Sequence, residues 1–420
     1  MEFLAELAGN PERCAPSIHI AGSKGKGSVT AMIASILEAD GRRAARYMSP
    51  HIADIRERVS MGNSFFDEAV YCAAGDELRD VAEHKVPMSH NSLFNPASEE
   101  GESLTFFELL TLYFFLCARA ARCDVMVVET GMGGRLDSTN IVDPLVSVIT
   151  LIELEHTAIL GGTIAAVAGE KAGIIKPGKP LILARQNAEA LDVFKQRTAE
   201  QNSPLWYFPD IATIENINIH RGGTDFSLIL LTQLPLTLSI PIPGAVQAEN
   251  AGLAVAALTT AFPGIKETAI RQGLANVKLP ARFEKIADNP VLIIDGAHTP
   301  ESALLCAETF CALYGEGGIL IFGCAADKNA AAMADILLPR FSQIIITTPG
   351  VFRTSSPEKA YRAFASEKTL LIKDTRAAVQ QAMETARANN LPILCTGSFY
   401  LVSEVTSINN SALKGGLLFR

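Results

Sequence analysis

The sequence predicts an α/β protein with two domains, the first of which carries a β-rich appendage. Three observations support this prediction. Apolar, strand-like runs alternate with helix-like segments along most of the chain, a glycine-rich loop joins the first strand to the first helix, and a second strand–helix series begins near Asp288. Such alternation is typical of a mostly parallel sheet covered by helices. The chain has 420 residues, 48% of them hydrophobic, which is enough for large buried cores.

The first domain is predicted to begin with a strand, a loop and a helix. Ser17–Ile20 is a short apolar run, and Val29–Ala39 has helical character that stops at the C-cap signal Asp40-Gly41. The same alternation continues with the helices Leu104–Ala121 and Thr163–Gly173 and the strands Val125–Val128, Val146–Leu151 and Pro180–Ala184. The β-branched run that ends at Glu129 is the kind expected of a buried parallel strand.

The appendage and the second domain follow. Ser203–Pro243 is rich in β-branched and turn residues, with predicted antiparallel strands at Leu228–Leu231 and Leu236–Ile240, before the helix Gln247–Ala261. The later strands are predicted at Val291–Ile294, Ile319–Phe322, Ile344–Thr347, Leu370–Ile372 and Ile393–Cys395, with helices such as Pro300–Leu313 and Arg376–Asn389 between them. We therefore expect two domains, residues 1–284 and 285–420, the second smaller and Rossmann-like.

Composition narrows the possible functions. The net charge of -9 is unfavourable for nucleic-acid binding, which needs a basic face.

Eight cysteines occur without a CxxC pair, so we expect buried thiols in a reducing cytosol rather than a zinc cluster. The N-terminus lacks the regions of a signal peptide, and the most apolar run, near Phe106–Ala120, is too short to cross a bilayer. We expect a cytoplasmic protein that binds no membrane.

The loop Gly22-Ser23-Lys24-Gly25-Lys26-Gly27-Ser28 is a candidate phosphate-binding loop. Glycines let backbone N–H groups approach a polyphosphate, the following helix N-terminus adds positive potential, and a lysine offsets charge. The loop departs from the pattern G-x-x-x-x-G-K-[ST], because Gly27 stands where the hydroxyl residue belongs and Ser28 comes one place later. The alternative is a tight turn before a helix. The preceding strand and the following helix favour phosphate binding.

Polar side chains also follow several predicted strands. Glu129 runs into a glycine-rich turn, where open α/β sheets bind ligands, and one such carboxylate suits a magnesium–nucleotide site. Asp295–His298 and Gly323–Lys328 are similar turns in the second domain. Each is also explained by an ordinary polar loop. Two domains that both present polar groups at strand ends suggest a cleft between them.

Two single residues are ambiguous on their own. His156, which follows Glu153 and Glu155, fits a structural histidine as well as a ligand. Lys171 lies at a helix end, where a cation complements the helix dipole.

Taken together, these segments resemble the folylpolyglutamate synthase and dihydrofolate synthase family of the Mur ligase superfamily. The resemblance is carried by motifs in a fixed order from Ile18 to Val405: Ile18–Ser28, Ser49–His51, Glu57–Val59, Glu129–Val142, His156-Thr157, Glu170–Gly178, Arg282–Glu284, Asp295–Glu301 and Thr396–Tyr400. Each motif alone is weak evidence for the family, but the occurrence of all of them in this order is highly specific. The resemblance implies a P-loop-containing, Mur-ligase-like central domain and a C-terminal glutamate-ligase domain.

The resemblance also implies a reaction and its cofactors. ATP phosphorylates a carboxylate of the pterin substrate, and the amino group of L-glutamate attacks the acyl phosphate. The substrate is a folate, which is extended by glutamate, or dihydropteroate, which becomes dihydrofolate; a bifunctional enzyme of the family accepts both. The implied cofactors are ATP and Mg²⁺, and Lys171 aligns with a lysine that is carbamylated in the family. We expect a monomer.

Residue roles follow from the same resemblance. Gly22–Ser28 matches the ATP phosphate loop, with Lys26 on the phosphates and Ser28 near a Mg²⁺. Ser49, Glu129 and His156 match the ligands of the other Mg²⁺. The remaining matches are to residues near the nucleotide or the incoming glutamate, namely Asn250, Arg282, Asp295 and His298. Lys26, Lys171 and His298 are thus the expected catalytic residues, with electrostatic preorganisation as their main effect.

Several positions depart from the family pattern. The usual Thr-Asn of the loop is Ser23-Lys24, the usual Asp before the metal-site histidine is Glu155, and the usual Asn after His298 is Thr299. An expected Arg-His pair is Ala245-Val246, and the N-terminal helix that helps bind dihydropteroate is expected to be short or absent, which favours tail extension. Two further alternatives remain: a Mur-type ligase for other substrates, and a nucleotide-binding homologue with impaired catalysis.

Overall fold

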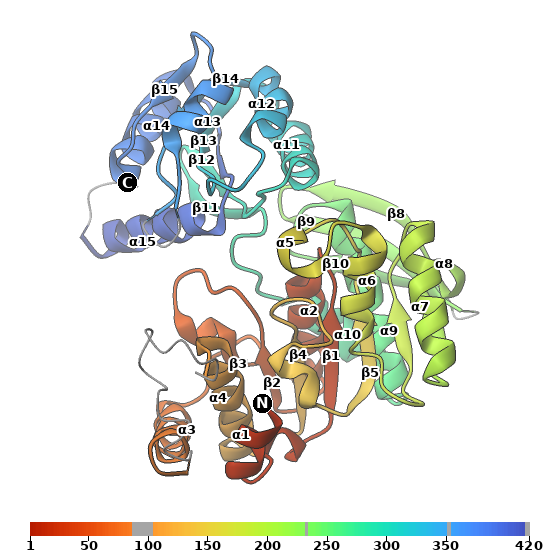
Figure 1. Cartoon of the computed structure of the whole chain (residues 1–420). Coiled ribbons are helices and arrows are strands. Elements are labelled where there is room, and N and C mark those ends of the chain that lie inside the picture. The colour runs from red at the N-terminus through yellow and green to blue at the C-terminus, as the bar shows by residue number, and fades with distance from the viewer. Residues whose placement is uncertain (86–103, 232–233, 351–353, 416–420) are drawn as a thin grey trace.

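The computed structural model describes residues 1–85, 104–231, 234–350 and 354–415. Within these ranges the strands form three sheets, and the chain is divided into a lower part with two sheets and an upper part with one (Figure 1). The α/β class predicted from the sequence is confirmed.

The first sheet has seven strands in the order β3-β2-β4-β1-β5-β6-β7. Its strands are β1 (Ser17–Ala21), β2 (Ala44–Tyr47), β3 (Val59–Met61), β4 (Val125–Glu129), β5 (Pro144–Ile149), β6 (Leu181–Leu183) and β7 (Leu205–Tyr207). Only the edge strand β3 is antiparallel to its neighbour. Because Ile20 pairs with Glu129 and Ala21 with Ile149, the carboxyl ends of β1, β4 and β5 meet at one edge.

Helices cover both faces of this sheet. They are α1 (Glu2–Leu7), α2 (Lys26–Ala39), α3 (Glu68–Asp80), α4 (Phe106–Ala120), α5 (Thr157–Leu160), α6 (Ile164–Ala172), α7 (Ala188–Glu200), α8 (Phe208–Ile211), α9 (Ala245–Ala261) and α10 (Glu267–Ala275). One core joins one sheet face to α2, α9 and α10, and two others join the opposite face to α4 and to α6 and α7. The sheet is therefore buried on both faces, as its apolar strands require.

The second sheet is a three-stranded antiparallel unit in the order β10-β9-β8, made of β8 (Ala212–His220), β9 (Gly223–Leu230) and β10 (Leu236–Ile240). Its inner residues Phe226, Leu228 and Leu238 join the core that contains α2 and α9. β8 was not predicted from the sequence. Its outward positions are mostly exposed and polar, so the segment lacks a continuous apolar run.

The third sheet has six strands in the order β11-β12-β16-β13-β14-β15. They are β11 (Glu284–Asp288), β12 (Val291–Ile294), β13 (Gly318–Phe322), β14 (Phe341–Ile346), β15 (Thr369–Leu371) and β16 (Ile393–Thr396). The five predicted strands are all present, and β11 is an additional antiparallel edge strand. Its residues are only partly buried and largely polar, which explains why no apolar pattern indicated it.

Helices cover both faces of the third sheet too. α11 (Pro300–Tyr314), α12 (Ala330–Leu337) and α13 (Pro357–Ala363) share a core with one face, and α14 (Thr375–Asn389) and α15 (Phe399–Gly415) share a core with the other. In the ranges that the structure describes, no helix combines the length and apolar character needed to span a bilayer.

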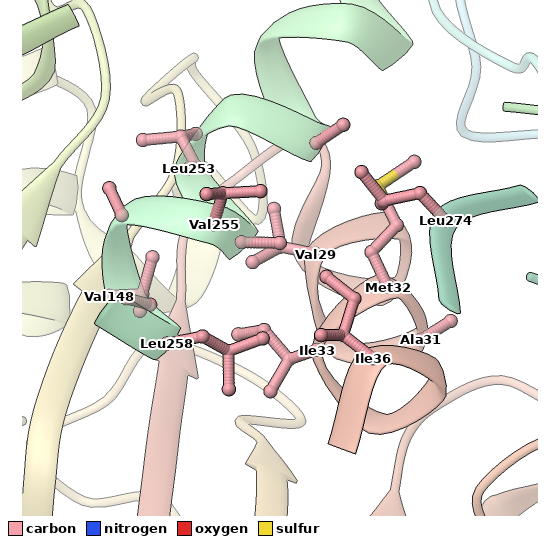
Figure 2. Packing of buried hydrophobic residues seen from close by; sticks show 14 of the residues in the cluster. Val29, Ala31, Met32, Ile33, Ile36, Val148, Leu253, Val255, Leu258 and Leu274 are labelled. Atoms are coloured by element: carbon pink, nitrogen blue, oxygen red, sulfur yellow. The ribbon is translucent and has the colours of Figure 1, made fainter. Parts of the chain in front are cut away.

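The helix after the phosphate loop, α2, is packed on all sides. Residues 27–37 are all buried, because the sheet, α9 and α10 surround the helix. Figure 2 shows Val29, Met32 and Ile33 of α2 beside Val255 and Leu258 of α9, with Leu274 of α10 nearby. Burying such a side chain stabilises the fold by roughly 1.5–3 kcal/mol. The loop is therefore anchored to a rigid helix.

A close helix–helix contact in this core yields a test. A Cβ on Gly273 of α10 would lie 2.3 Å from Ile36 Cα, a backbone atom of α2 that cannot move aside. We expect Gly273→Ala to destabilise the protein by about 1–3 kcal/mol, because overpacking forces the helices apart. The midpoint of thermal denaturation measures this.

The matched control is Gly169→Ala in α6, where a Cβ would have nothing within 4 Å. That substitution should be neutral or stabilise by about 0.5–1 kcal/mol, since alanine favours helix over glycine. Equal midpoints for the two variants would show that α2 and α10 have room to adjust.

Candidate active site between the two halves of the chain

A cavity of about 750 Å³ lies where the strand ends of the first and third sheets face each other. One wall consists of the phosphate loop, the segments that follow β4 and β5, and the first turn of α9. The opposite wall consists of the segment after β12, part of α11 and the first turn of α15. The arrangement expected from the sequence, with polar strand ends from both halves around one cleft, is present.

The phosphate loop is held tightly against the end of β5. The backbone N–H groups of Ser23 and Lys24 both donate to the Leu151 carbonyl, at 2.9 and 3.2 Å. Gly22 has a φ of +146°, and a Cβ there would lie 1.8 Å from Thr150 Oγ1, so this position requires glycine. Gly25 also has positive φ, and a Cβ there would lie 2.5 Å from Asn250 Oδ1.

The loop opens onto the N-terminus of α2, with Gly25 as its N-cap residue. The first N–H groups of a helix lack internal partners, so this end favours an anion. Lys26 Nζ donates to the Gly22 carbonyl at 2.7 Å and lies in the wall of the cavity. The amine is thus placed beside the space that a bound phosphate would take.

Glu129 at the end of β4 is a buried carboxylate with a suitable environment for a metal ion. It is 3% exposed, and its Oε2 accepts a hydrogen bond from the Ser49 N–H at 3.3 Å. Burial raises the pKa of Glu129 to about 7, although Lys26 lowers it. A Cβ on Gly27 would lie 3.6 Å from Glu129 Oε2, so the carboxylate faces the first turn of α2.

The donor set around Glu129 fits Mg²⁺. Ser28, Ser49 and His156 line the same cavity as Glu129. The Glu129 carboxylate and the Ser49 hydroxyl leave positions for phosphate and water oxygens, which Mg²⁺ prefers, and the His156 imidazole is the least typical member of this set. The Ser28 hydroxyl is a candidate ligand of the second expected Mg²⁺. His156 is exposed, and partial desolvation lowers its pKa, which favours the neutral ring that can ligate a metal.

Lys171 lies behind the phosphate loop rather than on the cavity surface. Its side chain is 1% exposed, and its Nζ donates to the Gly22 carbonyl at 2.8 Å and to Glu155 Oε1 at 2.7 Å. Burial lowers the pKa of Lys171 to about 8. The amine therefore has a substantial neutral fraction near physiological pH.

Two glycines bring Lys171 to this place. A Cβ on Gly134 would lie 2.9 Å from the Glu170 carbonyl oxygen, and one on Gly173 would lie 2.4 Å from Arg135 Cα. The glycine-rich segment after β4 can therefore lie directly against the C-terminal turn of α6. This contact fixes the helix that carries Lys171 relative to Glu129.

The second wall is organised by Asp295. Its two carboxylate oxygens accept hydrogen bonds from the N–H groups of Phe283 and Ala297, both at 2.8 Å. Phe283 adjoins Arg282, whose guanidinium lies 4.7 Å from the centre of the Phe399 ring. Asp295 thus holds the segment that presents Arg282 to the cavity.

His298 lies beside the same aromatic ring. Its Nδ1 is 2.8 Å from the Gly296 carbonyl, so the proton sits on Nδ1 and Nε2 is left as an acceptor. Burial lowers the pKa of His298 to about 4, which keeps the ring neutral at physiological pH. A neutral imidazole with a free acceptor can orient an amine.

Most of the predicted site residues meet at this cavity. Those in its lining are Ser23, Lys24, Gly25, Lys26, Gly27, Ser28, Ser49, Glu129, His156, Asn250, Arg282, Asp295 and His298. Gly22 and Lys171 lie outside the lining and contact each other. No hydrogen bond between the predicted metal ligands, apart from the Ser49 N–H to Glu129, is found in the described residues.

The sequence did not indicate the part of the cavity formed by α11. Glu301, Leu305, Thr309 and Ala312 line it, and Ile219 of β8 lies opposite in the same lining. The spacing of these α11 residues is helical, but a core-facing stripe has the same period. Only the position of the helix in the fold distinguishes the two.

Comparisons with known proteins agree with this geometry. Residues 82–258 match the family described as Mur ligase middle domain, and residues 281–399 match the Mur ligase, glutamate ligase domain. The chain is 34% identical to the folylpolyglutamate synthase of Lacticaseibacillus casei, over 96% of this chain and 92% of that protein. It is 30% identical to the dihydrofolate synthase/folylpolyglutamate synthase of Bacillus subtilis, over 96% and 93%.

Solved structures give the same result. The folylpolyglutamate synthase of Mycobacterium tuberculosis, complexed with ADP and AMPPCP, superposes with a TM-score of 0.88 at 29% identity, covering 97% of this chain and 93% of that chain. An FPGS-AMPPCP-folate complex superposes with a TM-score of 0.83 at 31% identity, covering 96% and 92%.

The position of Lys26 leads to a test of phosphate binding. We expect Lys26→Met to weaken AMPPCP binding roughly ten- to a hundredfold, because a hydrogen bond to a charged group contributes about 1.5–3 kcal/mol. Isothermal titration calorimetry measures the dissociation constant. Lys179→Met is the control, since Lys179 pairs with Asp143 at 3.1 Å outside the cavity. Equal affinities for the two variants would remove Lys26 from the phosphate site.

Proposed function

The chain belongs to the folylpolyglutamate synthase and dihydrofolate synthase family of Mur ligases, and we propose how its residues carry out the reaction. It is an ATP-dependent ligase that joins L-glutamate to a folate, and we propose that the reaction passes through an acyl phosphate. The observation that carries the assignment of roles is the cavity itself, with a phosphate loop on one wall and Asp295 and His298 on the other. The two walls correspond to the two domains that we place at residues 1–284 and 285–420.

The first wall would bind and activate the phosphates. The N–H groups at the start of α2 and the Lys26 amine would bind the β- and γ-phosphates of ATP. Ser28 would lie beside one Mg²⁺, and Ser49, Glu129 and His156 would hold the other, which would offset negative charge on the phosphoryl group while it transfers. Because burial raises the pKa of Glu129 to about 7, this carboxylate gains most from a cation bound beside it.

The second wall would receive the amino acid. Once the folate carboxylate carries the phosphoryl group, the amine of glutamate attacks the acyl carbon, the amide bond forms and phosphate leaves. The unprotonated Nε2 of His298 can accept a hydrogen bond from that amine. With a pKa of about 4 the ring is a weak base, so we assign it orientation of the amine rather than removal of its proton.

Arg282 and Asp295 act together in this proposal. Arg282 projects into the cavity from the segment between the domains, and Asp295 holds that segment through the Phe283 N–H. The guanidinium is then placed to contact the nucleotide when both walls approach it. Asn250 would contact the nucleotide from the start of α9, where it also lies against Gly25.

Lys171 would act after modification to a carbamate. Its neutral amine adds to CO₂ and loses one proton, and the product is an anion that can orient a metal-bound substrate. The amine now pairs with Glu155 at 2.7 Å, so carbamylation requires that ion pair to open. The low pKa supports the proposal, because only the neutral amine reacts with CO₂.

Both walls of the cavity come from one chain, which supports action as a monomer. All eight cysteines are free, which is the usual state in a reducing cytoplasm, where we place the enzyme.

The preferred acceptor is proposed to be a folate that already carries glutamate, with dihydropteroate as the second candidate. The relative from Lacticaseibacillus casei is named folylpolyglutamate synthase alone, and the relative from Bacillus subtilis carries both names. Purified protein should release ADP only when a folate and L-glutamate are both present, and mass spectrometry should find the product one glutamate heavier. Release of ADP without either substrate would contradict the function. Comparing tetrahydrofolate with dihydropteroate as acceptor separates the two activities.

The Lys171 proposal makes a pH-dependent prediction. Because its pKa is about 8, the neutral fraction of the amine rises roughly tenfold between pH 7 and pH 9. At equal concentrations of dissolved CO₂, preincubation should therefore activate CO₂-depleted enzyme faster at pH 9 than at pH 7. Activity in a common assay buffer after timed preincubation measures the rate.

Lys171→Ala should be nearly inactive and insensitive to bicarbonate. Native mass spectrometry should detect one added CO₂ on the original protein and none on the variant. Full activity after removal of CO₂, or in Lys171→Ala, would remove carbamylation from the mechanism.

A further inference from the structure

Lys24, which stands where the family usually has asparagine, connects the two walls of the cavity. Its backbone N–H is bound to the Leu151 carbonyl, so the start of the side chain is fixed. The side chain then crosses to the other wall, where Nζ lies 3.3 Å from Thr299 Oγ1. Thr299 is the N-cap residue of α11, which follows Asp295 and His298. The phosphate loop is thereby hydrogen-bonded to the helix of the second wall.

Charged groups surround the Lys24 amine. Glu153 Oε2 lies 4.0 Å away, and Glu155 also attracts the amine, whereas Lys26 and Arg282 repel it. Glu153 is itself repelled by Glu301 in the first turn of α11. Lys24 therefore sits between a carboxylate of the first wall and a helix end of the second, and offsets repulsion between them.

The other end of α11 has a separate contact with the first half of the chain. Arg221, in the turn between β8 and β9, donates from Nε to the Leu313 carbonyl at 3.0 Å, and its guanidinium lies 4.9 Å from the centre of the Tyr314 ring. Figure 1 shows α11 next to this end of the β8–β9 pair. The helix has 15 residues, so the two contacts lie about 20 Å apart.

We propose that Lys24 is a positioning residue that links occupancy of the phosphate loop to the placement of α11. A polyphosphate on the loop offers charged oxygens next to Lys24, and an ammonium group binds an anionic oxygen more strongly than the neutral hydroxyl of Thr299. The amine then leaves Thr299 for the phosphates. The N-terminal end of α11 is released while Arg221 still holds the C-terminal end. Asp295 and His298, which lead into the released end, move with it.

The proposal predicts that Thr299 competes with the nucleotide for Lys24. We expect Thr299→Ala to tighten AMPPCP binding roughly two- to tenfold, because the amine no longer has to give up a hydrogen bond. In a Lys24→Met background the same substitution should have no effect. Thr299→Ala also removes the N-cap of α11, but it does so in both backgrounds, so the effect of the lost cap on affinity cancels when the two backgrounds are compared. Calorimetric dissociation constants of the four proteins complete the cycle.

Three further variants keep the test decisive. Thr299→Ser retains the hydroxyl and should behave as the original protein. Glu153→Gln removes a carboxylate 4.0 Å from the Lys24 amine and leaves the helix cap intact, so it should tighten binding more in the original protein than in the Lys24→Met background. Arg221→Ala breaks the contact at the far end of α11 and should leave AMPPCP affinity unchanged in both backgrounds.

Equal effects of Thr299→Ala and Glu153→Gln in the Lys24 and Met backgrounds would overturn the proposal, as would tighter binding in Arg221→Ala. Equal effects in the two backgrounds would show that the nucleotide does not compete with Thr299 or Glu153 for the Lys24 amine. Tighter binding in Arg221→Ala would show that loosening α11 at either end raises the affinity for AMPPCP.

The consequence for turnover rests on the proposed function. Thr299→Ala releases the N-terminal end of α11 without nucleotide, so it should lower KM for ATP while kcat changes less. An unchanged KM for ATP in Thr299→Ala would make Lys24 a simple phosphate ligand. The binding cycle uses AMPPCP and needs no turnover. A protein without folate-dependent activity can therefore still show the coupling, and the two proposals fail separately.

Discussion

The close approach of the phosphate loop to the end of β5 is the constraint on which the rest of the site depends. Gly22 passes so near Thr150 that a side chain has no room, and the next two N–H groups share the Leu151 carbonyl. This geometry directs the Gly22 carbonyl toward both Lys26 and Lys171. It also determines where the Lys24 side chain starts. A loop displaced by one ångström would lose these contacts together, because all of them rest on the same backbone atoms.

Burial sets the chemistry of the groups around that loop. It raises the pKa of Glu129 and lowers the pKa values of Lys171 and His298, and in each case it disfavours the charged form. Such groups respond strongly to ligands of opposite charge, because little water is present to screen them. The cavity is therefore arranged so that a magnesium–nucleotide complex supplies the charge that the protein alone does not balance. Electrostatic preorganisation of this kind suits phosphoryl transfer.

The two walls depend on each other through few contacts. The phosphate loop reaches the second wall through Lys24 and Thr299, and the β8–β9 turn reaches it through Arg221. Ser403 of α15 also donates to the Ile52 carbonyl. The cores that contain α2 and α11 are separate, but Ile52 of the first half packs into the core that contains α14 and α15. A small number of links allows the walls to shift without unfolding either core.

The sequence by itself determined the strand–helix alternation, the phosphate loop and the polar strand ends, since these follow from local periodicity and from glycine spacing. The sequence did not indicate β8, in which the alternation of isoleucines with polar residues is broken by an irregularity between Glu215 and Asn218, or β11, which is short and largely polar. It also left Lys171 ambiguous between a helix-end cation and a site residue. Only the tertiary structure brought Lys171 onto the Gly22 carbonyl and made α11 a wall of the cavity. Lys24 was a departure without an explanation until Thr299, 275 residues away along the chain, lay within hydrogen-bond distance. Such contacts depend on how the two halves of the chain are placed relative to each other, and local sequence patterns do not determine that placement.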